Sequence, residues 1–173
     1  GMRIVHIYHS GVLVELDETV LLFDWWQGEL PDFDHGKLVL CFVSHRHHDH
    51  YDPRIFSLDK SCPNICLLLD SGIDSNTFPQ VNAEIIAVGP YHDYMVSGVR
   101  VRTAQSNDEG VAFLVEAEGK SIYHSGDLNV WWWDRDRKLN ECSDAMFRHE
   151  IEELGAHNVD VAFVPLDTRL ADP

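Results

Sequence analysis

The segment from His45 to His50 concentrates side chains that bind metal ions. Four histidines and one aspartate fall within six residues, His45-Arg46-His47-His48-Asp49-His50. Imidazole and carboxylate groups are the usual protein ligands of zinc and similar ions. A purification tag would lie at a terminus and would contain no aspartate. The segment therefore predicts a metal site on a single loop.

Two adjacent ions on such a loop would suit hydrolysis. Together they would lower the pKa of a shared water, so that hydroxide forms near neutral pH. They would also stabilise the oxyanion that forms when this hydroxide attacks a carbonyl or phosphoryl group. Asp49 is the candidate catalytic residue, because its carboxylate could position and deprotonate the water.

The elements on either side of the loop support this interpretation. Leu38–Val43 is apolar throughout, as expected of a strand covered on both faces. Loops that follow buried strands commonly carry active sites. Downstream, Asp52-Pro53 is a typical N-cap and first helical position, and it predicts a short helix through Leu58.

The rest of the chain alternates strands with a late helix. A helix is expected over Glu141–Leu154, with apolar residues on one face and Gly155 ending it. A turn at Gly119-Lys120 should join two strands. The order of elements favours helices layered on sheets in one domain. The other strands are expected at Arg3–Tyr8, Val12–Leu16, Thr19–Asp24, Ile65–Leu69, Glu84–Val88, Val99–Thr103, Val111–Ala117, Ser121–His124 and Val159–Val164.

Composition limits the function classes. The 173 residues carry a formal net charge of −16, which disfavours nucleic-acid partners and favours a small-molecule substrate. No apolar run approaches the length of about 20 residues that spans a membrane, and no signal peptide is visible. We therefore expect a cytoplasmic protein without a membrane partner. The sequence does not predict an oligomeric state.

The cysteines allow two interpretations. Cys41 lies in an apolar run and is expected to be a buried free thiol. Cys62 and Cys66 are close enough to form a metal or redox pair, although unpaired thiols are the favoured interpretation.

The spacing of His45, His47, Asp49 and His50 resembles the His-x-His-x-Asp-His signature of the metallo-β-lactamase superfamily. Leu21–Asp24 is similar to the family's strand that ends in aspartate, and Tyr123–Asp127 to its later strand that ends in Gly-Asp. His9–Glu15 resembles the opening hairpin of the branch that contains ascorbate-6-phosphate lactonases. The resemblance covers roughly Ile4 to Leu166.

This resemblance implies an α/β (α+β) fold, a four-layer αββα sandwich over residues 2–173; Gly1 resembles a residue left by an expression vector. It implies one or two divalent ions, zinc as the favoured ion with manganese, iron or nickel as alternatives. His45 and His47 would hold the first ion, Asp49 and His50 the second, and Asp127 would bridge both. Asp24 would orient a ligand histidine, and His9 and His124 would lie around the ligands.

Two departures from the family pattern stand out. Gln105 occupies the position where the family carries a further ligand histidine, and its carboxamide oxygen suits manganese better than zinc. Asp108 is an alternative ligand if the alignment is shifted by three residues. The final family histidine has no counterpart before Pro173, so we expect the domain to be truncated at its C-terminal end.

The favoured interpretation is a metal-dependent hydrolase that uses a metal-bound hydroxide on an ester, lactone or phosphodiester of a small molecule. The alternative is a degenerate, non-catalytic member of the same fold that binds metal or ligand. Ribonuclease Z-like processing of RNA is a third class, which the acidic composition disfavours. Trp131-Trp132-Trp133 and Trp25-Trp26 could be packed apolar clusters or walls of the substrate pocket.

Overall fold

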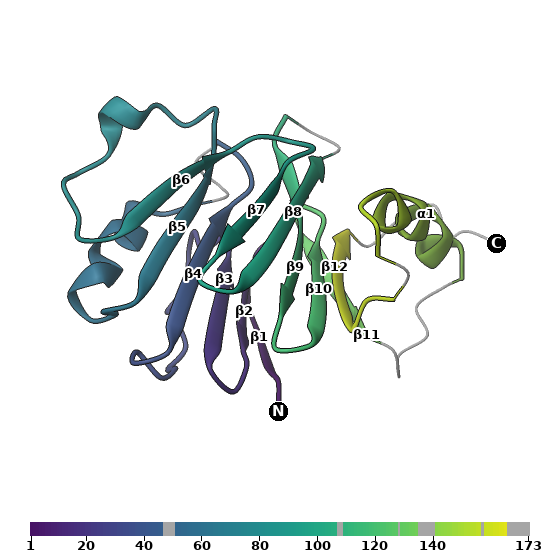
Figure 1. Ribbon diagram of the computed structural model, residues 1–173, viewed down its shortest axis with the longest axis horizontal. Coiled ribbons are helices and arrows are strands. Elements are labelled where there is room, and N and C mark those ends of the chain that lie inside the picture. Colours follow the sequence, from purple (N-terminus) through teal and green to yellow (C-terminus); the bar gives the residue numbers. More distant parts are fainter. Residues whose placement is uncertain (47–50, 107–108, 128, 135–140, 157, 166–173) are drawn as a thin grey trace. The chain divides into compact units, whose positions relative to one another are not determined.

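The apolar runs of the sequence form two six-stranded sheets in the computed structural model (Figure 1). The structure describes residues 1–46, 51–106, 109–127, 129–134, 141–156 and 158–165, with only the backbone at 133–134 and 141–146. Two compact units, Gly1–Gly89 and Pro90–Pro173, each contain one sheet. A single domain over residues 2–173 stays a prediction.

The first unit holds a mixed sheet in which strand order follows sequence order, β1-β2-β3-β4-β5-β6. The pairings of β1 with β2 and of β2 with β3 are antiparallel, and those from β3 to β6 are parallel. The elements are β1 (Arg3–Tyr8), β2 (Gly11–Glu15), β3 (Thr19–Phe23), β4 (Leu38–Val43), the 3₁₀ helices η1 (Pro53–Lys60) and η2 (Ser75–Thr77), β5 (Ile65–Asp70) and β6 (Glu84–Val88).

Burial explains why the central strands of this sheet lack polar alternation. Every residue of β3 and β5 is buried, as are all residues of β4 except Leu38. One face of these strands packs against Ile55, Phe56 and Leu58 of η1. The predicted N-cap is confirmed, because the Asp52 carboxylate accepts a hydrogen bond from Arg54 N at 2.9 Å.

The three described cysteines lie buried within this unit as free thiols. Burial, and then the neighbouring Cys62 and Cys66, raise the pKa of the Cys41 thiol. Burial, followed by the charge of Glu84, raises the pKa of Cys66 to about 12. Thiols held in their neutral form are poor nucleophiles and metal ligands. The favoured interpretation of unpaired thiols is therefore confirmed for these residues.

The second unit has the strand order β11-β12-β10-β9-β8-β7. Only β10 and β12 pair in parallel; the other pairings are antiparallel. Helix α1 packs on one face through Phe147 and Ile151 and lies beside β12 (Figure 1). The elements are β7 (Asp93–Val96), β8 (Val99–Gln105), β9 (Val111–Ala117), β10 (Lys120–His124), β11 (Val130–Asp134), α1 (Glu141–Glu153) and β12 (Val161–Pro165).

Some sequence predictions for this unit need correction. The hairpin between β9 and β10 turns at Glu118-Gly119, one residue earlier than predicted, and both residues have positive φ, 54° and 74°. Two positive φ angles match the tight turn that best suits strand twist. The tryptophan run lies on β11 at a sheet edge, and Trp131 is 47% exposed. Trp131 is therefore not part of a packed apolar cluster.

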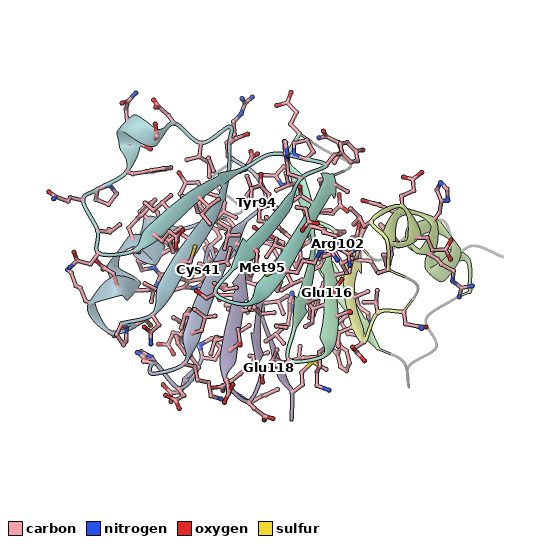
Figure 2. All side chains as sticks on the ribbon, viewed as in Figure 1. Cys41, Tyr94, Met95, Arg102, Glu116 and Glu118 are labelled. Atoms are coloured by element: carbon pink, nitrogen blue, oxygen red, sulfur yellow. The ribbon has the colours of Figure 1, made fainter. Side chains whose placement is uncertain are left out.

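Arg102 fastens the end of α1 to the sheet. Its guanidinium donates to the Leu154 carbonyl oxygen and pairs with Glu116 on the neighbouring strand (Figure 2). Gly155 follows with φ +89°, and a Cβ there would lie 2.6 Å from Arg102 Nη1. The left-handed conformation is what favours glycine at this position. The predicted helix end at Gly155 is confirmed.

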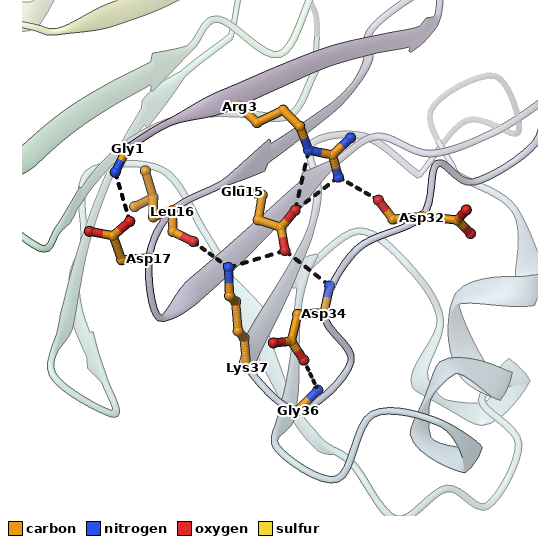
Figure 3. Close-up of polar contacts among 9 residues, drawn as sticks. All are labelled: Gly1, Arg3, Glu15, Leu16, Asp17, Asp32, Asp34, Gly36 and Lys37. Atoms are coloured by element: carbon orange, nitrogen blue, oxygen red, sulfur yellow. Dashed lines mark hydrogen bonds and ion pairs between the residues drawn. The ribbon is translucent and has the colours of Figure 1, made fainter.

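A network of polar contacts fixes one end of the first sheet around Glu15 (Figure 3). The Glu15 carboxylate accepts from Arg3 Nη2 at 2.9 Å, Asp34 N at 3.0 Å and Lys37 Nζ at 3.2 Å. Burial alone would raise the pKa of Glu15, but these three donors lower it to about 2. The ionised carboxylate therefore ties β2 to the segment before β4.

Replacing Glu15 with glutamine should destabilise the protein in a pH-dependent way. Because the folded pKa is about 2 and an ordinary glutamate titrates near about 4.3, the stabilisation is present above pH 4.3 and is lost as pH falls toward 2. At pH 7 we expect a loss of about 1 kcal/mol in the free energy of unfolding, measured with urea. Glu29→Gln, at an exposed position, is the control. A Glu15→Gln difference that stays constant down to pH 2 would contradict this assignment.

Candidate metal centre

Asp24, Ser44 and His45 lie at one edge of the first sheet. The histidine-rich loop begins at this edge. Strands β3 and β4 run in parallel with Phe23 opposite Phe42, so both strands end at this edge. Val12, near the start of β2, is opposite Phe23, which brings the His9-Ser10 turn to the same edge. The parallel pairing of β3 with β4 and the antiparallel pairing of β2 with β3 thus gather residues from three separate segments.

A continuous hydrogen-bond chain joins Asp24 to His45 through Ser44. Ser44 N donates to Asp24 Oδ1 at 2.8 Å, and Ser44 Oγ donates to Asp24 Oδ2 at 2.5 Å. The same Ser44 Oγ lies 2.9 Å from His45 Nδ1. Asp24 is 1% exposed, and Ser44 and His45 are completely buried. Asp24 therefore lies where it can orient His45, but indirectly, through a serine to which the sequence analysis assigned no role.

The loop that follows Asp24 is held in place by η1. Trp25 O accepts from Asp52 N at 2.9 Å, and the Arg54 guanidinium lies 4.5 Å above the buried Trp25 ring. Trp25 is therefore a core residue, as one of its two interpretations required. Chain segments on both sides of the histidine-rich loop are thus anchored to the segment after β3, upstream through Ser44 and downstream through Asp52.

His9 lies at this edge within a group of aromatic rings. Its ring stacks on Trp26 with centroids 5.5 Å apart and meets Tyr8 edge-on at 4.1 Å. Its backbone has φ 51°. The turn comes close to the end of β3, since a Cβ on Gly11 would lie 3.1 Å from the Asp24 carbonyl oxygen. His9 therefore lies at the same edge of the first sheet as Asp24, and its place around the metal ligands stays a prediction.

The remaining predicted ligands of the loop, His47, Asp49 and His50, lie outside the described residues. Within the part of the chain that the structure describes, no group of three or more His, Cys, Asp or Glu side chains is arranged to hold an ion. The predicted ligand set is consequently seen in part, at His45 in the first unit and at Asp127 in the second.

Asp127 lies in the turn after β10 and is 8% exposed. Gly126 precedes it with φ 77°, and Asp127 N donates to Ser125 Oγ at 3.4 Å. Ser125 N donates to Phe163 O of β12 at 2.9 Å. The turn is thus fixed to a neighbouring strand, which restrains the backbone that carries the Asp127 carboxylate.

His124 supports this turn through its ring. Its Nδ1 accepts a hydrogen bond from Gly126 N at 3.0 Å, and the side chain is completely buried. An imidazole that accepts at Nδ1 carries its proton on Nε2 when it is neutral. Neither nitrogen then has a lone pair left for an ion, so this geometry favours a structural role for His124.

Gln105 is the last residue of β8, not part of the following loop. The register pairs Gln105 with Val111 and His124 with Phe113, so β8 and β10 end at the same end of this sheet. The Gln105 side chain is exposed, and its Nε2 donates to Gly110 O at 3.1 Å. It lines a cavity of 640 Å³ with Tyr91, Ala104, His149, Glu150, Glu153 and Leu154.

Glu150 is a site candidate that the sequence analysis missed. Burial raises the pKa of its carboxyl, the contact with Tyr123 opposes this, and the nearby charges of Asp127 and Glu153 raise it further. A carboxyl group with a raised pKa beside a cavity is a candidate for proton exchange with a bound ligand. The helix periodicity predicted α1 itself but gave no signal that Glu150 lies near Asp127.

Comparison with known proteins agrees with this architecture. The family described as Beta-lactamase superfamily domain matches residues 3–171. A UPF0173 metal-dependent hydrolase of Opitutus terrae is 27% identical, over 95% of this chain and 72% of its own length. A protein of the same description from Alkaliphilus metalliredigens is 23% identical, over 95% and 73%.

Two solved structures share the fold. The metallo hydrolase Igni18 of Ignicoccus hospitalis has a TM-score of 0.54 and 15% identity, over 73% of this chain and 60% of its own. The metallo-β-lactamase fold protein YhfI of Bacillus subtilis has a TM-score of 0.54 and 16% identity, over 73% and 62%. The chain thus spans less than two thirds of either structure. It belongs to the metallo-β-lactamase superfamily and has that superfamily's α+β fold.

Proposed function

We propose that this protein is a metal-dependent hydrolase of small molecules. The observation that carries the proposal is the buried chain from Asp24 through Ser44 to His45, directly before the histidine-rich loop. A histidine that ligates a metal commonly has its other ring nitrogen bonded to a carboxylate or another polar partner. The relatives named metal-dependent hydrolases support the same assignment.

The described donors fit a divalent ion. His45 is completely buried, and Ser44 occupies its Nδ1, so Nε2 is the nitrogen that would face an ion. In the second unit, the Asp127 carboxylate is also largely withdrawn from solvent, because this residue is 8% exposed. Imidazole with carboxylate suits zinc, with manganese, iron or nickel as alternatives. We propose one or two ions held by His45, His47, Asp49, His50 and Asp127.

A bound divalent ion supplies Lewis acidity, which makes a nearby water more acidic and stabilises negative charge on the attacked group. In this proposal Asp49 orients that water and accepts its proton on a carboxylate oxygen. Asp24 and Ser44 hold the His45 ring in place, while the Ser125 hydroxyl and the His124 ring fix the Asp127 turn. Esters, lactones and phosphodiesters are the proposed substrate class.

The charge of the protein bears on the choice of substrate. A net charge of −16 lowers the local concentration of polyanions such as RNA. We therefore propose small molecules as substrates and exclude nucleic acids as partners. The three buried free thiols fit a reducing compartment, and we propose the cytoplasm. Within the described residues, no helix is long and apolar enough to cross a membrane.

A second function rests on Gln105. This residue stands where the family carries a ligand histidine, and its amide donates to Gly110 O instead. A member of the fold that binds a metal or a ligand without turnover is therefore the alternative, and the following experiments separate it from a hydrolase.

Metal binding should depend on the histidine-rich loop. Elemental analysis of protein purified without an affinity tag should show zinc, manganese, iron or nickel, and the His45→Ala, His47→Ala double variant should lose most of it. The matched control replaces two exposed histidines, His35 and His92, and should keep its metal. Unchanged metal content in the His45, His47 variant would show that the site has been assigned wrongly.

Replacing Gln105 with histidine should tighten zinc binding if this position faces the metal. Changes in the partners of metal ligands alter affinity by about 10–100-fold, and a new imidazole ligand should do no less than about tenfold. Competition with a chromogenic chelator would measure the affinity. No change in Gln105→His together with weaker binding in Asp108→Ala would identify Asp108 as the ligand.

Hydrolysis should be found among small substrates. A panel of phosphodiesters, phosphomonoesters, lactones and thioesters, tested beside a structured RNA, should show turnover of a small ester that is lost in Asp49→Asn. Metal binding with no turnover of any substrate would favour the non-catalytic alternative. Preferential cleavage of RNA that disappears in Asp49→Asn would refute the proposed substrate class.

A further inference from the structure

Ser44 links the Asp24 carboxylate to the His45 ring through its backbone N–H and its hydroxyl. It follows β4 directly and is completely buried. Its backbone N–H and its hydroxyl bind different oxygens of the same carboxylate. The Asp24 carboxylate is thereby fixed in rotation, and the Ser44 hydroxyl is fixed between two polar partners.

The direction of the proton along this chain follows from what each group can do. A carboxylate only accepts hydrogen bonds, and a serine hydroxyl has one proton to donate. At 2.5 Å from Asp24 Oδ2, the Ser44 hydroxyl must place its proton in that short, charge-assisted bond. The 2.9 Å contact between Ser44 Oγ and His45 Nδ1 can then be a hydrogen bond only if Nδ1 carries a proton and donates it.

We propose that Ser44 is a positioning residue that selects the tautomer of His45 with its proton on Nδ1 and its lone pair on Nε2. Because the lone pair is the part of an imidazole that binds a metal, Ser44 prepares His45 for an ion before the ion arrives. This inference rests on the proposed function for its purpose, but the tautomer itself is a property of the metal-free protein.

The substitution Asp24→Asn can reverse the direction of the hydrogen bonds between Asp24 and His45 with almost no change in side-chain shape. In Asp24→Asn, the amide oxygen would keep the bond from Ser44 N, and the amide nitrogen would face Ser44 Oγ. The amide then donates to the hydroxyl, and the hydroxyl donates to His45 Nδ1. The His45 proton must move to Nε2, so the nitrogen that would bind the ion loses its lone pair.

Nitrogen NMR of protein labelled with ¹⁵N-histidine reads the tautomer directly. Spectra of metal-free protein at pH 8, where imidazole is ordinarily neutral, should show the Nδ1–H form of His45, with its signals assigned by their loss in His45→Ala. Ser44→Thr keeps a hydroxyl and should keep this form. Asp24→Asn should give the Nε2–H form, and Ser44→Ala should give a mixture.

Zinc affinity provides the second measurement. We expect Ser44→Ala to weaken zinc binding by about 10–100-fold, with Ser44→Thr close to the unsubstituted protein. The matched control is Thr19→Val, which removes a buried hydroxyl at the opposite end of β3. Circular dichroism and urea unfolding identify any variant that fails to fold, and the Asp24→Asn spectrum then tests the link without removing Ser44.

Each outcome separates this inference from the proposed function. An Nε2–H form of His45 in the unsubstituted protein, or a spectrum that Ser44→Ala and Asp24→Asn both leave unchanged, overturns the role of Ser44. If the tautomer responds as described but the protein binds no divalent ion, the Ser44 link stands and the metal-dependent function fails.

Discussion

Parallel pairing of β3 with β4 brings the ends of two buried strands together, and the candidate metal centre depends on this pairing. Asp24 N donates to Phe42 O at 2.9 Å, which continues the ladder one residue beyond β3. The carboxylate of Asp24 then reaches the backbone and hydroxyl of Ser44 on the adjacent strand end. Without this register, residues 20 positions apart in the sequence could not share one proton chain. The apolar runs of β3 and β4 form the paired strands, and this pairing brings Asp24 and Ser44 into contact at the strand ends.

The second unit positions Asp127 by different means. Its strands are joined mainly by antiparallel pairings, and the tight turn at Glu118-Gly119 fixes the register between β9 and β10. That register sets where β10 ends and therefore where the Gly126-Asp127 turn begins. The bond from Ser125 N to Phe163 O then fastens the turn to β12, the one parallel neighbour of β10. The backbone that carries Asp127 is thus placed by the end of β10 and by this hydrogen bond to β12.

Sequence patterns predicted the buried elements well, because continuous apolar runs have few alternatives. The predicted limits of Leu38–Val43 and Val111–Ala117 agree with the structure at both ends. The strand β7 was missed because its four residues are too few to form a clear apolar run. Its turn did leave a signal, since Ser97-Gly98 has two positive φ angles, 48° and 83°, and Ser-Gly is a typical turn pair.

The candidate site was less predictable than the fold. Ligand spacing indicated His45 as a candidate, and the resemblance of Leu21–Asp24 to a family strand indicated Asp24. The sequence did not predict the hydrogen-bond link through Ser44, because a serine before a histidine can have many structural roles and its partner Asp24 is distant in sequence. Gln105 was expected in a loop, yet β8 extends through it by pairing with Val111. Contacts between strands, not local preferences, decided both features.

Stability alone gives no reason for the arrangement at the edge of the first sheet. In this unit, the described non-glycine residues with positive φ are His9 and Asp24, at 51° and 48°, and both lie at this edge. Such conformations are unfavourable for most residues by about 1–3 kcal/mol. Burying a carboxylate adds a further desolvation cost, which hydrogen bonds offset only when all its partners are in place. An apolar pair at Asp24 and Ser44 would avoid the desolvation cost, but it would not relieve the positive φ at position 24. Strain and buried polarity therefore coincide at the residues that lead into the histidine-rich loop, and this coincidence is expected where a structure holds a functional group in a fixed state.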